Sequence, residues 1–258
     1  MKKALITGIA GFAGYHLAEF LSSKKIKVFG FYHPHHSSEN LELIKEKIEL
    51  IACDVLESGA LKKNLKNIKP DYVFHYAARV GVKRTTEKPL EVFADLEGIK
   101  NILELSRKYK VKKVMFASSS EVYGEPVELP EREDGPLNIH IPYATVKLAG
   151  EQMMRVYYEL YGLPTCSLRF FNVYGPRQDG SAYGFVVGIF MKKALAGEPL
   201  TIFGRGNQTR DFVFVADNIR ASLLALLSDK TDGEVLNIGR QKPRTIMALA
   251  KAVEKVSG

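Results

Sequence analysis

Residues 4–14 read Ala-Leu-Ile-Thr-Gly-Ile-Ala-Gly-Phe-Ala-Gly, a short apolar run that leads into three spaced glycines. The run predicts a buried strand over 4–7, and the periodicity after it predicts a helix over 12–24 with Leu17 and Leu21 on its apolar face. Glycine permits a tight turn and lets the backbone approach a pyrophosphate, which the N–H groups of a helix amino terminus attract. The stretch therefore favours dinucleotide binding over an ordinary glycine-rich turn. The expected contacts come from Gly8, Gly11, Phe12, Ala13 and Gly14.

Beyond this stretch, β-rich runs alternate with amphipathic segments, which is typical of β-α-β units and a parallel sheet. The expected strands cover residues 28–32, 48–52, 72–76, 113–117, 165–171 and 235–238, and the expected helices cover 89–109, 142–161, 217–228 and 245–256. We expect an α/β fold with a Rossmann-type doubly wound parallel sheet. The carboxyl ends of its strands should meet at one edge, where such sheets bind their ligands.

The character of the chain changes after Asn172, where glycines and prolines become frequent and the expected strands become short. We therefore assign residues 1–171, with 210–238 returning to them, to a dinucleotide-binding Rossmann domain. Residues 172–209 and 239–258 are expected to form a small C-terminal substrate-binding lobe.

The composition of the 258 residues is that of a soluble globular protein, with 46% hydrophobic and 26% charged residues. These values exclude a disordered chain, a collagen-like repeat and a coiled coil. Lys and Arg number 37 against 29 Asp and Glu, which gives a net charge of +8. Because the basic residues are dispersed and not interleaved with aromatic residues, they favour a solvated surface over a nucleic-acid patch. We expect neither nucleic acid nor a membrane as a partner.

The two cysteines and the apolar runs indicate the compartment. Cys53 and Cys166 each lie in an apolar, strand-like run, which favours buried reduced thiols. The lysines at positions 2 and 3 before an apolar run resemble a signal peptide faintly, but glycines interrupt the run and no small-residue cleavage site comes after it. The longest later uncharged apolar stretch, residues 181–191, is too short to span a bilayer. The expected location is cytoplasmic.

The end of the second strand bears on which dinucleotide is bound. Residues 31–36 read Phe-Tyr-His-Pro-His-His, and a carboxylate that would hold an adenosine ribose and select NAD is missing there. A 2′-phosphate is better tolerated at such a site, and His33 or a nearby lysine could meet it. The expected cofactor is NAD(P), with NADP favoured and NAD left open. The histidines are otherwise a polar loop, and no metal is expected because no Cys, Asp or Glu completes a ligand set.

Two further elements are predicted at the same edge of the sheet. Tyr143 and Lys147 stand four residues apart near the start of a long helix, so their side chains share a face. A lysine ammonium beside a phenol stabilises the phenolate, which lets the tyrosine act as a base near neutral pH. Ser119 comes after the fifth strand, where its hydroxyl could bind the same substrate oxygen as Tyr143. A tyrosine and a lysine at this spacing are common by chance. The pair becomes significant because it, Ser119 and the glycine turn are all predicted at the same edge of the sheet.

With these elements in place, the chain resembles the extended short-chain dehydrogenase/reductases of the NAD-dependent epimerase/dehydratase family, which modify sugar nucleotides. The resemblance covers nearly the whole chain. Its motifs, besides the glycine turn, are Asp54-Val55, His75-Tyr76-Ala77-Ala78, residues 119–124 and 143–147, Arg169-Phe170-Phe171-Asn172-Val173-Tyr174-Gly175-Pro176-Arg177-Gln178, and residues 203–212.

The resemblance implies roles for the matching positions. Asp54 and Val55 would lie at the adenine, Ala77 and Ala78 along the nicotinamide side, and Phe171 near the nicotinamide. Further cofactor contacts are implied at His33, Tyr76, Tyr143 and Lys147. The implied substrate contacts are Lys83, Ser119, Ser120, Asn172, Arg177, Phe203 and Arg210.

Asn172, Arg177 and Arg210 would hold the diphosphate of the sugar nucleotide, because guanidinium groups bind phosphate oxygens in pairs. Surface ion pairs of the two arginines with Asp179 and Asp211 are the alternative.

The implied activity is that of a nucleotide-sugar 4-epimerase of the UDP-hexose type, acting on a UDP- or GDP-linked sugar. Tyr143 would remove the proton of the sugar 4-hydroxyl while hydride leaves C4, Ser119 would bind the new carbonyl, and Lys147 would hold the ribose and lower the pKa of Tyr143. The ketone would then turn over and receive hydride on its other face.

Glu121 keeps another reaction open. It resembles the glutamate that 4,6-dehydratases and UDP-glucuronate decarboxylases of the family carry beside their Ser or Thr, although it is equally explained as a polar loop residue. The catalytic residues of the chain are thus expected to be Ser119, Tyr143 and Lys147, with Glu121. A non-catalytic NADP(H)-binding sensor or scaffold is the alternative from another class, and the joint presence of Ser119, Tyr143 and Lys147 argues against it.

Two features depart from the family pattern. Asp95 stands where the family usually has asparagine, and the chain stops at Gly258, whereas most relatives run on through a segment that completes the sugar pocket. The sequence is therefore either a short form or a cut one.

A homodimer is also expected, with residues 89–109 and 142–161 pairing across a two-fold axis, because the second helix carries apolar residues on more than one side.

Overall fold

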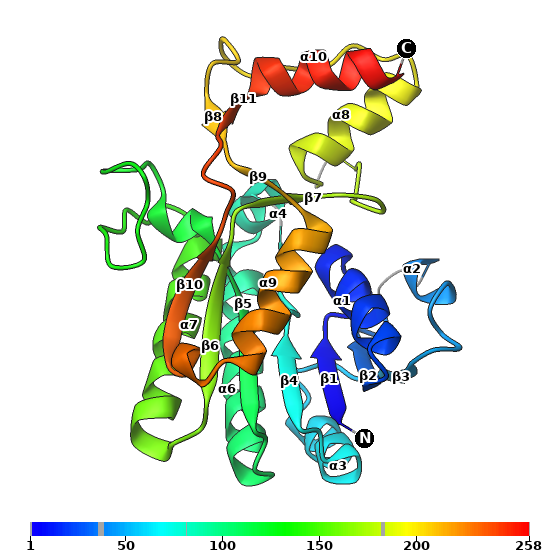
Figure 1. Ribbon diagram of the computed structural model, residues 1–258, viewed down its shortest axis with the longest axis vertical. Coiled ribbons are helices and arrows are strands. Elements are labelled where there is room, and N and C mark those ends of the chain that lie inside the picture. Colours follow the sequence, from blue (N-terminus) through cyan, green and yellow to red (C-terminus); the bar gives the residue numbers. More distant parts are fainter. Residues whose placement is uncertain (1, 36–38, 81, 182–183, 258) are drawn as a thin grey trace.

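The computed structural model of the protein describes residues 2–35, 39–80, 82–181 and 184–257, without the side chains of Glu39 and residues 82–84. Its main feature is a seven-stranded sheet in the order β10-β6-β5-β4-β1-β2-β3, in which all neighbouring strands are parallel (Figure 1). The strands are β1 (Lys3–Thr7), β2 (Lys27–Tyr32), β3 (Glu49–Ala52), β4 (Tyr72–His75), β5 (Lys113–Ser119), β6 (Thr165–Phe170) and β10 (Glu234–Ile238). The order reverses between β1 and β4, as expected for a Rossmann-type sheet, so the predicted fold class is confirmed.

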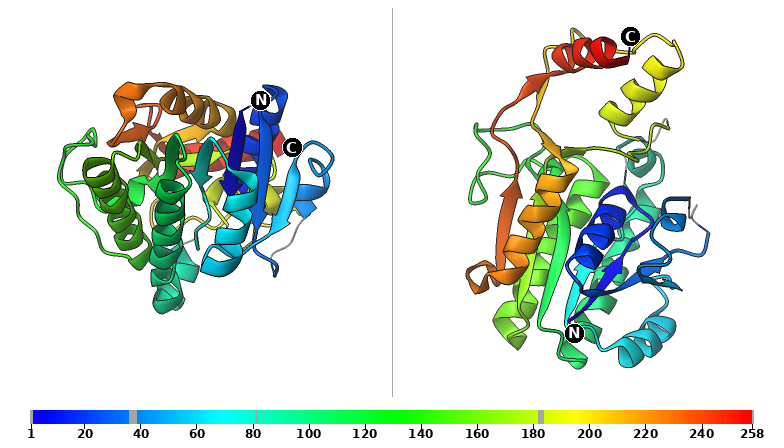
Figure 2. Two further views of the ribbon diagram at one scale, coloured as in Figure 1. Left: turned by 90° about the horizontal axis from the view of Figure 1, so that it is seen from below. Right: turned by 45° about the vertical axis from the view of Figure 1, so that its right-hand side comes forward.

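Helices cover both faces of this sheet, which explains why its central strands are mostly buried and largely apolar. Ile6 and Met115 pack on one face beneath α1 and α9, whereas Leu5 and Phe116 pack on the other beneath α3, α6 and α7 (Figures 1 and 2). The helices are α1 (Phe12–Ser23), α3 (Ser58–Ile68), α6 (Asp95–Lys108), α7 (Pro142–Tyr161) and α9 (Val215–Leu227). Two separate apolar cores therefore hold the sheet from its two sides.

Two details differ from the sequence-based expectation and bear on the site. The long helix expected over 89–109 is divided into α5 (Pro89–Phe93) and α6, so Asp95 lies in the first turn of a helix, where a negative charge is favourable. Strand β5 continues to Ser119 instead of ending at residue 117, because every residue of β5 is buried and Ser118 and Ser119 still pair with β6.

An upper part of the molecule lies beyond the carboxyl edge of the main sheet (Figures 1 and 2). It contains two small sheets and two helices, which surround a core of their own that includes Phe190, Ile246 and Val253. Its elements are β7 (Asn172–Tyr174), α8 (Val186–Leu195), β8 (Thr209–Arg210), β9 (Phe212–Phe214), β11 (Arg244–Thr245) and α10 (Ile246–Ser257). The remaining short elements are α2 (Glu39–Glu42), α4 (Val82–Glu87), η1 (Ser120–Tyr123) and η2 (Asp229–Thr231).

Other expectations concern cysteines, membranes and metals. Cys53 and Cys166 are free and buried, as expected. Within the described ranges, no helix has the length and apolarity needed to traverse a bilayer. The same part of the chain brings together no group of three or more His, Cys, Asp or Glu side chains that could hold a metal ion.

Candidate active site

The turn between β1 and α1 is built from glycines that a larger residue could not replace. Gly8 has a φ of 70°, and a Cβ there would lie 2.6 Å from the backbone nitrogen of Ala77. A Cβ on Gly14 would lie 2.4 Å from the carbonyl oxygen of Gly8, to which Gly11 donates its N–H at 3.0 Å. The turn is therefore packed tightly against the chain that leaves β4, at the carboxyl edge of the sheet.

The first turn of α1 fits an anionic group. It contains no Asp or Glu, and its cap residue Gly11 has no side chain that could accept hydrogen bonds from the N–H groups. These N–H groups carry the positive end of the helix dipole. Gly8, Gly11, Phe12, Ala13 and Gly14 thus lie together at a helix amino terminus, and their arrangement fits the pyrophosphate of a dinucleotide.

Thr7 joins the carboxyl ends of β1 and β4. Its Oγ1 lies 2.8 Å from Nδ1 of His75 and accepts a hydrogen bond from the N–H of Ala77 at 3.2 Å. The imidazole of His75 stacks against Phe116, and burial lowers the pKa of His75 to about 3. Thr7, itself bound to a neutral histidine, therefore fixes the backbone at Ala77, next to Ala78, where the nicotinamide side of the cofactor is expected.

The Tyr76 side chain turns away from this edge. Its ring packs edge-on against Phe74 and Phe170, and its hydroxyl donates to Oγ of Ser222 on α9 at 3.0 Å. The side chain belongs to the core under α9. The expected contact of the Tyr76 side chain with the cofactor is therefore wrong, and only its backbone lies at this edge.

The sequence offers no carboxylate in the residues that end β2, but the structure places one there, that of Asp54 from the end of the neighbouring strand β3. Nε2 of His33 lies 3.4 Å from Oδ2 of Asp54, which lies just past the end of β3. The other carboxylate oxygen of Asp54 accepts the N–H of Leu56 at 2.9 Å, and Asn101 donates to the carbonyl oxygen of Val55 at 3.1 Å. His33, Asp54 and Val55 therefore lie together where the adenosine end of a dinucleotide is expected.

Ser119, Tyr143 and Lys147 meet at the carboxyl end of β5. Tyr143 and Lys147 share a face of α7, with Nζ of Lys147 5.5 Å from the centre of the Tyr143 ring. The Tyr143 side chain forms a hydrogen bond with Ser119, and Nζ of Lys147 donates to the carbonyl oxygen of Ala117 at 2.6 Å. The structure thus brings together the three side chains that sequence reasoning placed at one site.

Burial dominates the acid–base properties of this pair. It raises the pKa of Tyr143 well above its usual value, and the hydrogen bond with Ser119 opposes that rise. Burial also lowers the pKa of Lys147 to about 8, against the attraction of Asp95. The expected lowering of the Tyr143 pKa by Lys147 is therefore absent in this arrangement, because removing the phenolate from water has the larger effect.

Glu121 lies next to the hydroxyl of Ser119. The short helix η1 starts directly after β5, and Oγ of Ser119 caps it by accepting the N–H of Glu121 at 3.2 Å. Ser120 and Glu121 are both half-buried, and the charge of Glu121 acts to raise the pKa of Tyr143. The glutamate is thus placed beside the Ser119–Tyr143 hydrogen bond.

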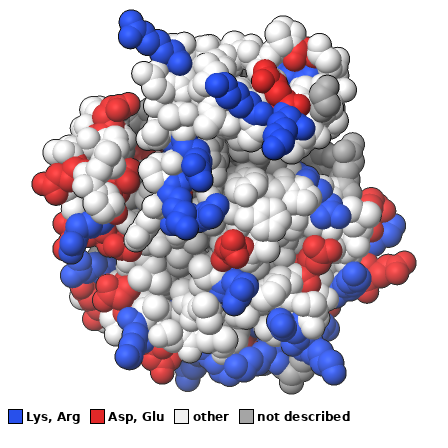
Figure 3. All heavy atoms as spheres, turned by 45° about the horizontal axis from the view of Figure 1, so that its top comes forward, with Lys and Arg blue, Asp and Glu red and all other residues white. Residues whose placement is uncertain are grey.

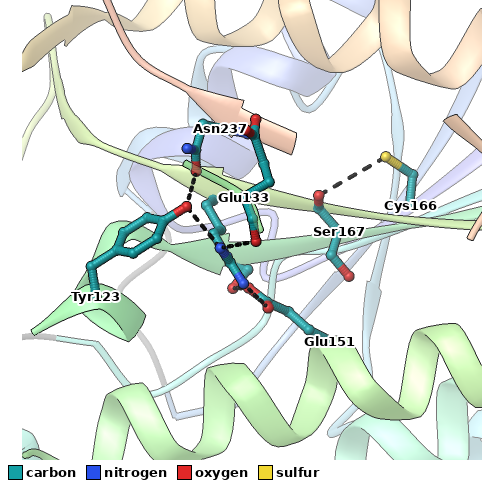
Figure 4. A network of polar contacts seen from close by, with 8 residues as sticks. Tyr123, Glu133, Glu151, Cys166, Ser167 and Asn237 are labelled. Carbon is teal, nitrogen blue, oxygen red and sulfur yellow. Dashed lines mark hydrogen bonds and ion pairs between the residues drawn. The ribbon is translucent and has the colours of Figure 1, made fainter. Parts of the chain in front are cut away.

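A buried polar network lies behind these residues (Figure 4). The guanidinium of Arg169 donates to both carboxylate oxygens of Glu151, at 2.9 and 2.8 Å, and Ser118 donates to the same carboxylate at 2.5 Å. Arg169 also donates to the hydroxyl of Tyr123, which in turn donates to Asn237 at 2.8 Å. The network connects α7, β5, β6, η1 and β10, so it fixes the strand end and η1 against the helix that carries Tyr143.

This network was not predicted from the sequence. One feature of the sequence pointed to it: Glu151 lies four residues after Lys147 and therefore shares its helix face. Its partner Arg169 was part of a motif but had no expected role.

The two arginines expected at a diphosphate do not form the ion pairs that were the alternative. The guanidinium of Arg177 lies 4.5 Å from the centre of the Tyr15 ring, and the exposed Arg210 donates to the neighbouring carbonyl group at 2.8 Å. Asp179 instead accepts hydrogen bonds from a serine two residues along, and Asp211 accepts N–H groups of the connection after β10. Lys and Arg side chains gather where the upper part meets the main body, on the face that Figure 3 shows.

The other expected substrate residues are spread over the same edge. Asn172 donates through its backbone and side-chain nitrogens to a carbonyl oxygen beside β9, at 3.0 and 3.3 Å. The ring of Phe171 lies 6.4 Å from that of Tyr123, and Phe203 is 81% exposed in the loop before β8. Lys83 belongs to α4, and its side chain lies outside the part of the structure that is described.

The fold and the site together define a dinucleotide-binding enzyme with a tyrosine–lysine pair at the carboxyl edge of its sheet. Residues 4–239 match the NAD dependent epimerase/dehydratase family. The chain belongs to this family and is an enzyme of the nucleotide-sugar epimerase/dehydratase type.

Relatives in sequence and structure agree. The chain is 36% identical over 264 residues to the UDP-N-acetyl-alpha-D-glucosaminuronate decarboxylase of Bacillus cytotoxicus, covering 99% of this chain and 80% of that protein. The crystal structure of UDP-glucose 4-epimerase from Thermotoga maritima with UDP-glucose superimposes with a TM-score of 0.93 at 33% identity, over 99% of this chain and 82% of that one. UDP-glucuronic acid 4-epimerase from Bacillus cereus, in complex with UDP-glucuronic acid and NAD, gives a TM-score of 0.88 at 33% identity, over 99% and 83%.

Proposed function

We propose that the protein is a nucleotide-sugar 4-epimerase of the UDP-hexose type that works with a bound nicotinamide dinucleotide. The observation that carries this proposal is the meeting of Ser119, Tyr143 and Lys147 at the same edge of the sheet as the glycine turn. A protein that only sensed or stored the dinucleotide would need no base at this position, so the arrangement favours an enzyme.

The chain offers a complete set of residues for the dinucleotide. The turn from Gly8 to Gly14 would hold the pyrophosphate, His33, Asp54 and Val55 would hold the adenosine, and Ala77 and Ala78 would line the nicotinamide side. The expectation of NADP depended on the lack of a carboxylate at the end of β2, and Asp54 supplies one beside His33. A carboxylate favours a ribose hydroxyl over a 2′-phosphate, so we propose NAD as the cofactor. Titration with NADH and with NADPH, monitored by the fluorescence of the reduced nicotinamide, decides between them.

The residues around the sugar would move one proton. Tyr143 accepts the proton of the C4 hydroxyl, and Ser119 donates a hydrogen bond to the oxygen as it becomes a carbonyl. Lys147 would hold the ribose of the dinucleotide from the same face of α7 that carries Tyr143. A bound nicotinamide ring supplies reversible hydride acceptance at C4. When the sugar presents its other face, Tyr143 returns the proton to the same oxygen, and the C4 configuration is inverted.

Elimination or decarboxylation is the second candidate, and the position of Glu121 favours it. A carboxylate beside the Ser119–Tyr143 hydrogen bond could take a proton from the carbon next to the ketone, which dehydration requires. The relative from Bacillus cytotoxicus is named as a decarboxylase of a uronate. The two reactions share the oxidised sugar and differ in how that sugar then reacts.

We propose that residues 172–209 and 239–258, which form most of the upper part, are the sugar-nucleotide lobe. Arg177 within it and Arg210 directly after its first segment would hold the diphosphate. Neither guanidinium takes part in the local ion pairs that would otherwise explain it, and basic side chains gather on this face (Figure 3). Guanidinium groups match phosphate oxygens in geometry and charge.

A homodimer through α5, α6 and α7 completes the proposal. Leu160 on α7 is 70% exposed and Leu90 on α5 is 83% exposed, and both are large apolar side chains that a partner could cover. Light scattering of the purified protein tests this part, and a monomer at working concentration contradicts it.

Product identification tests the proposed activity. The purified protein is incubated with UDP-glucose, UDP-N-acetylglucosamine, UDP-glucuronate and GDP-mannose, each with NAD, and the products are separated and identified. A C4 epimer from at least one substrate is expected, and its formation should stop in Tyr143→Phe. Unchanged turnover in that variant overturns the role of Tyr143, and a keto-deoxy sugar or a pentose as product favours the second candidate.

A further inference from the structure

His16 joins the helix of the glycine turn to the segment that carries Arg177. Its Nε2 lies 2.9 Å from the carbonyl oxygen of Pro176, where the connection after β7 passes over α1 (Figure 1). Because a carbonyl oxygen can only accept a hydrogen bond, Nε2 carries the proton and donates it. The ring of His16 packs edge-on against those of Phe12 and Tyr15, with 5.2 Å between the ring centres in each pair. The histidine is thus held on α1 by two aromatic side chains and reaches the next segment through Nε2.

The backbone at Arg177 has an unusual conformation that neighbouring groups must support. Its φ is 66°, in the left-handed region that residues other than glycine seldom adopt. The carbonyl group of Pro176 belongs to the same rigid peptide plane as the backbone nitrogen of Arg177. The hydrogen bond from His16 therefore fixes the plane from which the Arg177 backbone turns, and with it the direction in which the Arg177 side chain leaves.

The Arg177 side chain lies against the same helix. Its guanidinium is 4.5 Å from the centre of the ring of Tyr15, which is buried. A cation over an aromatic face is attracted by the electrons of the ring. Among the described residues Arg177 forms no ion pair, so the hydrogen-bond donors of its guanidinium are available to an anion.

Two other contacts shape the segment between β7 and α8. Nε2 of Gln178 donates to the carbonyl oxygen of Val173 at 2.7 Å, and a Cβ on Gly175 would lie 2.6 Å from Cγ1 of Val215. These contacts give the segment its shape, whereas the contacts with α1 determine where the guanidinium lies.

We propose that His16 is a positioning residue whose hydrogen bond to Pro176 holds the guanidinium of Arg177 over the Tyr15 ring, from where it binds the diphosphate of the substrate. The inference rests on the proposed function, because the proposed diphosphate site gives the position of Arg177 its use. His16 acts through Arg177 and needs no contact with the substrate.

Three variants separate the hydrogen bond from the rest of the side chain. His16→Phe keeps an aromatic ring against Phe12 and Tyr15 but removes the donor. The dissociation constant for UDP, measured by calorimetry, should then rise about 2- to 10-fold, which corresponds to one net hydrogen bond. His16→Gln keeps a nitrogen that can donate to the same carbonyl group and should bind UDP nearly as well as the original protein. Ser22→Ala, which removes a hydrogen bond from α1 to the carbonyl oxygen of Lys47, is the matched control.

A double variant shows whether His16 acts through Arg177. If it does, adding His16→Phe to Arg177→Ala weakens UDP binding little further, so the two effects are not additive. The affinity for NADH should be unchanged in His16→Phe, because the glycine turn is intact. Where the original protein binds UDP, the inference is overturned by unchanged UDP affinity in His16→Phe, by additive effects, or by an equal loss of NADH affinity.

A second measurement needs no substrate. The Tyr15 ring should shift the NMR signal of the Arg177 Nε–H group, and the signal is assigned from its loss in Arg177→Lys. His16→Phe should move this signal toward that of an exposed arginine, and His16→Gln should not. If UDP does not bind and no nucleotide sugar is converted, but the signal moves in this way, the proposed function fails and the positioning by His16 stands. If the signal stays in place in His16→Phe, the inference is overturned even in an active enzyme.

Discussion

The ammonium nitrogen of Lys147 lies 2.6 Å from the carbonyl oxygen of Ala117, two residues before the end of the strand that carries Ser119. This contact fixes helix α7 against the end of β5 and so determines where the hydroxyl groups of Ser119 and Tyr143 meet. It also takes the ammonium out of water, and the lowered pKa of Lys147 records the energetic cost of doing so.

Because burying the ammonium costs free energy, replacing Lys147 by an uncharged residue should raise the free energy of unfolding by an amount that depends on pH. The pKa of Lys147 is about 8 in the folded protein, whereas the ordinary pKa of a lysine side chain, which applies to the unfolded chain, is 10.5. Between these values the unfolded chain binds a proton that the folded one lacks, so the penalty is full below about pH 8 and is lost as the pH rises to 10.5. Lys147→Met should therefore raise the free energy of unfolding at pH 7 by up to about 3 kcal/mol, and by almost nothing above pH 10.

Urea unfolding of Lys147→Met at pH 7 and pH 10 measures this difference, with the exposed Lys100→Met as control. Equal effects of Lys147→Met at the two pH values would show that the ammonium carries no burial penalty. The variant should lose the proposed 4-epimerase activity at both pH values despite its higher stability.

Breaking the Glu151–Arg169 pair is expected to destabilise the fold strongly. Both side chains are almost fully buried and joined by two hydrogen bonds, so Glu151→Gln leaves a buried guanidinium without its charge partner. Such a change costs about 3–5 kcal/mol, and Glu151→Gln combined with Arg169→Met should recover part of it. Arg155→Met removes an exposed ion pair on the same helix and should cause no measurable loss. Urea unfolding of the four proteins checks this, and equal losses for the two helix positions would contradict it.

Two helical glycines should respond in opposite ways to the same substitution. A Cβ at Gly14 would lie 2.4 Å from the carbonyl oxygen of Gly8, whereas a Cβ at Gly59 in α3 meets nothing within 4 Å. Gly14→Ala should lose about 1–3 kcal/mol of stability and weaken NAD binding, because the glycine turn must shift. Gly59→Ala should gain about 0.5–1 kcal/mol from the lower flexibility of its unfolded state and leave NAD binding unchanged. Thermal unfolding and titration calorimetry with NAD measure both, and equal effects would contradict the tight contact at Gly14.

The elements that the sequence predicted well are those fixed by local patterns. The apolar run before Gly8, the spacing of the glycines and the four-residue interval between Tyr143 and Lys147 each depend on neighbours along the chain. The meeting of the strand carboxyl ends at one edge was expected from right-handed β-α-β connections. The break between α5 and α6 carried no proline or glycine signal and was therefore missed.

The contacts that set the properties of the site were not predictable in this way. Asp54 reaches His33 only because β2 and β3 are adjacent, and Arg79 reaches Asp95 only because α6 begins beside the end of β4. The ionisation of Tyr143 depends on how much water packing removes, which the residue types do not reveal. Position along the chain predicted that Ser119, Tyr143 and Lys147 meet, whereas packing determines how Tyr143 and Lys147 ionise.

The two arginines at the proposed diphosphate site should matter more for substrate affinity than for folding. Both are exposed, so Arg210→Ala should leave the core intact, whereas Arg177→Ala uncovers the ring of the buried Tyr15 and should cost a little stability. A charge-assisted hydrogen bond contributes about 1.5–3 kcal/mol, which corresponds to a rise in KM of about 10- to 100-fold for each variant. Steady-state kinetics and thermal unfolding of Arg177→Ala, Arg210→Ala and the control Arg155→Ala separate the two effects. An unchanged KM in both site variants would remove the arginines from the substrate site.

Glu121→Gln distinguishes the two candidate reactions, because only one of them needs a second base. Glutamine keeps the size of the side chain and the backbone N–H that Ser119 accepts, so the Ser119–Tyr143 hydrogen bond should persist. Epimerisation, which needs only Tyr143 as a base, should then continue at a similar rate, and its limb in the pH profile should move slightly to lower pH because a charge that raises the pKa of Tyr143 is gone. Dehydration or decarboxylation should fall on the order of 10²–10⁴-fold, the contribution of a positioned acid or base.

The control is Glu125→Gln, which changes an exposed glutamate just beyond η1 and should affect neither reaction. If the purified protein epimerises a UDP-sugar and Glu121→Gln stops it, then Glu121 takes part in proton removal itself, and a mechanism with Tyr143 as the sole base is wrong.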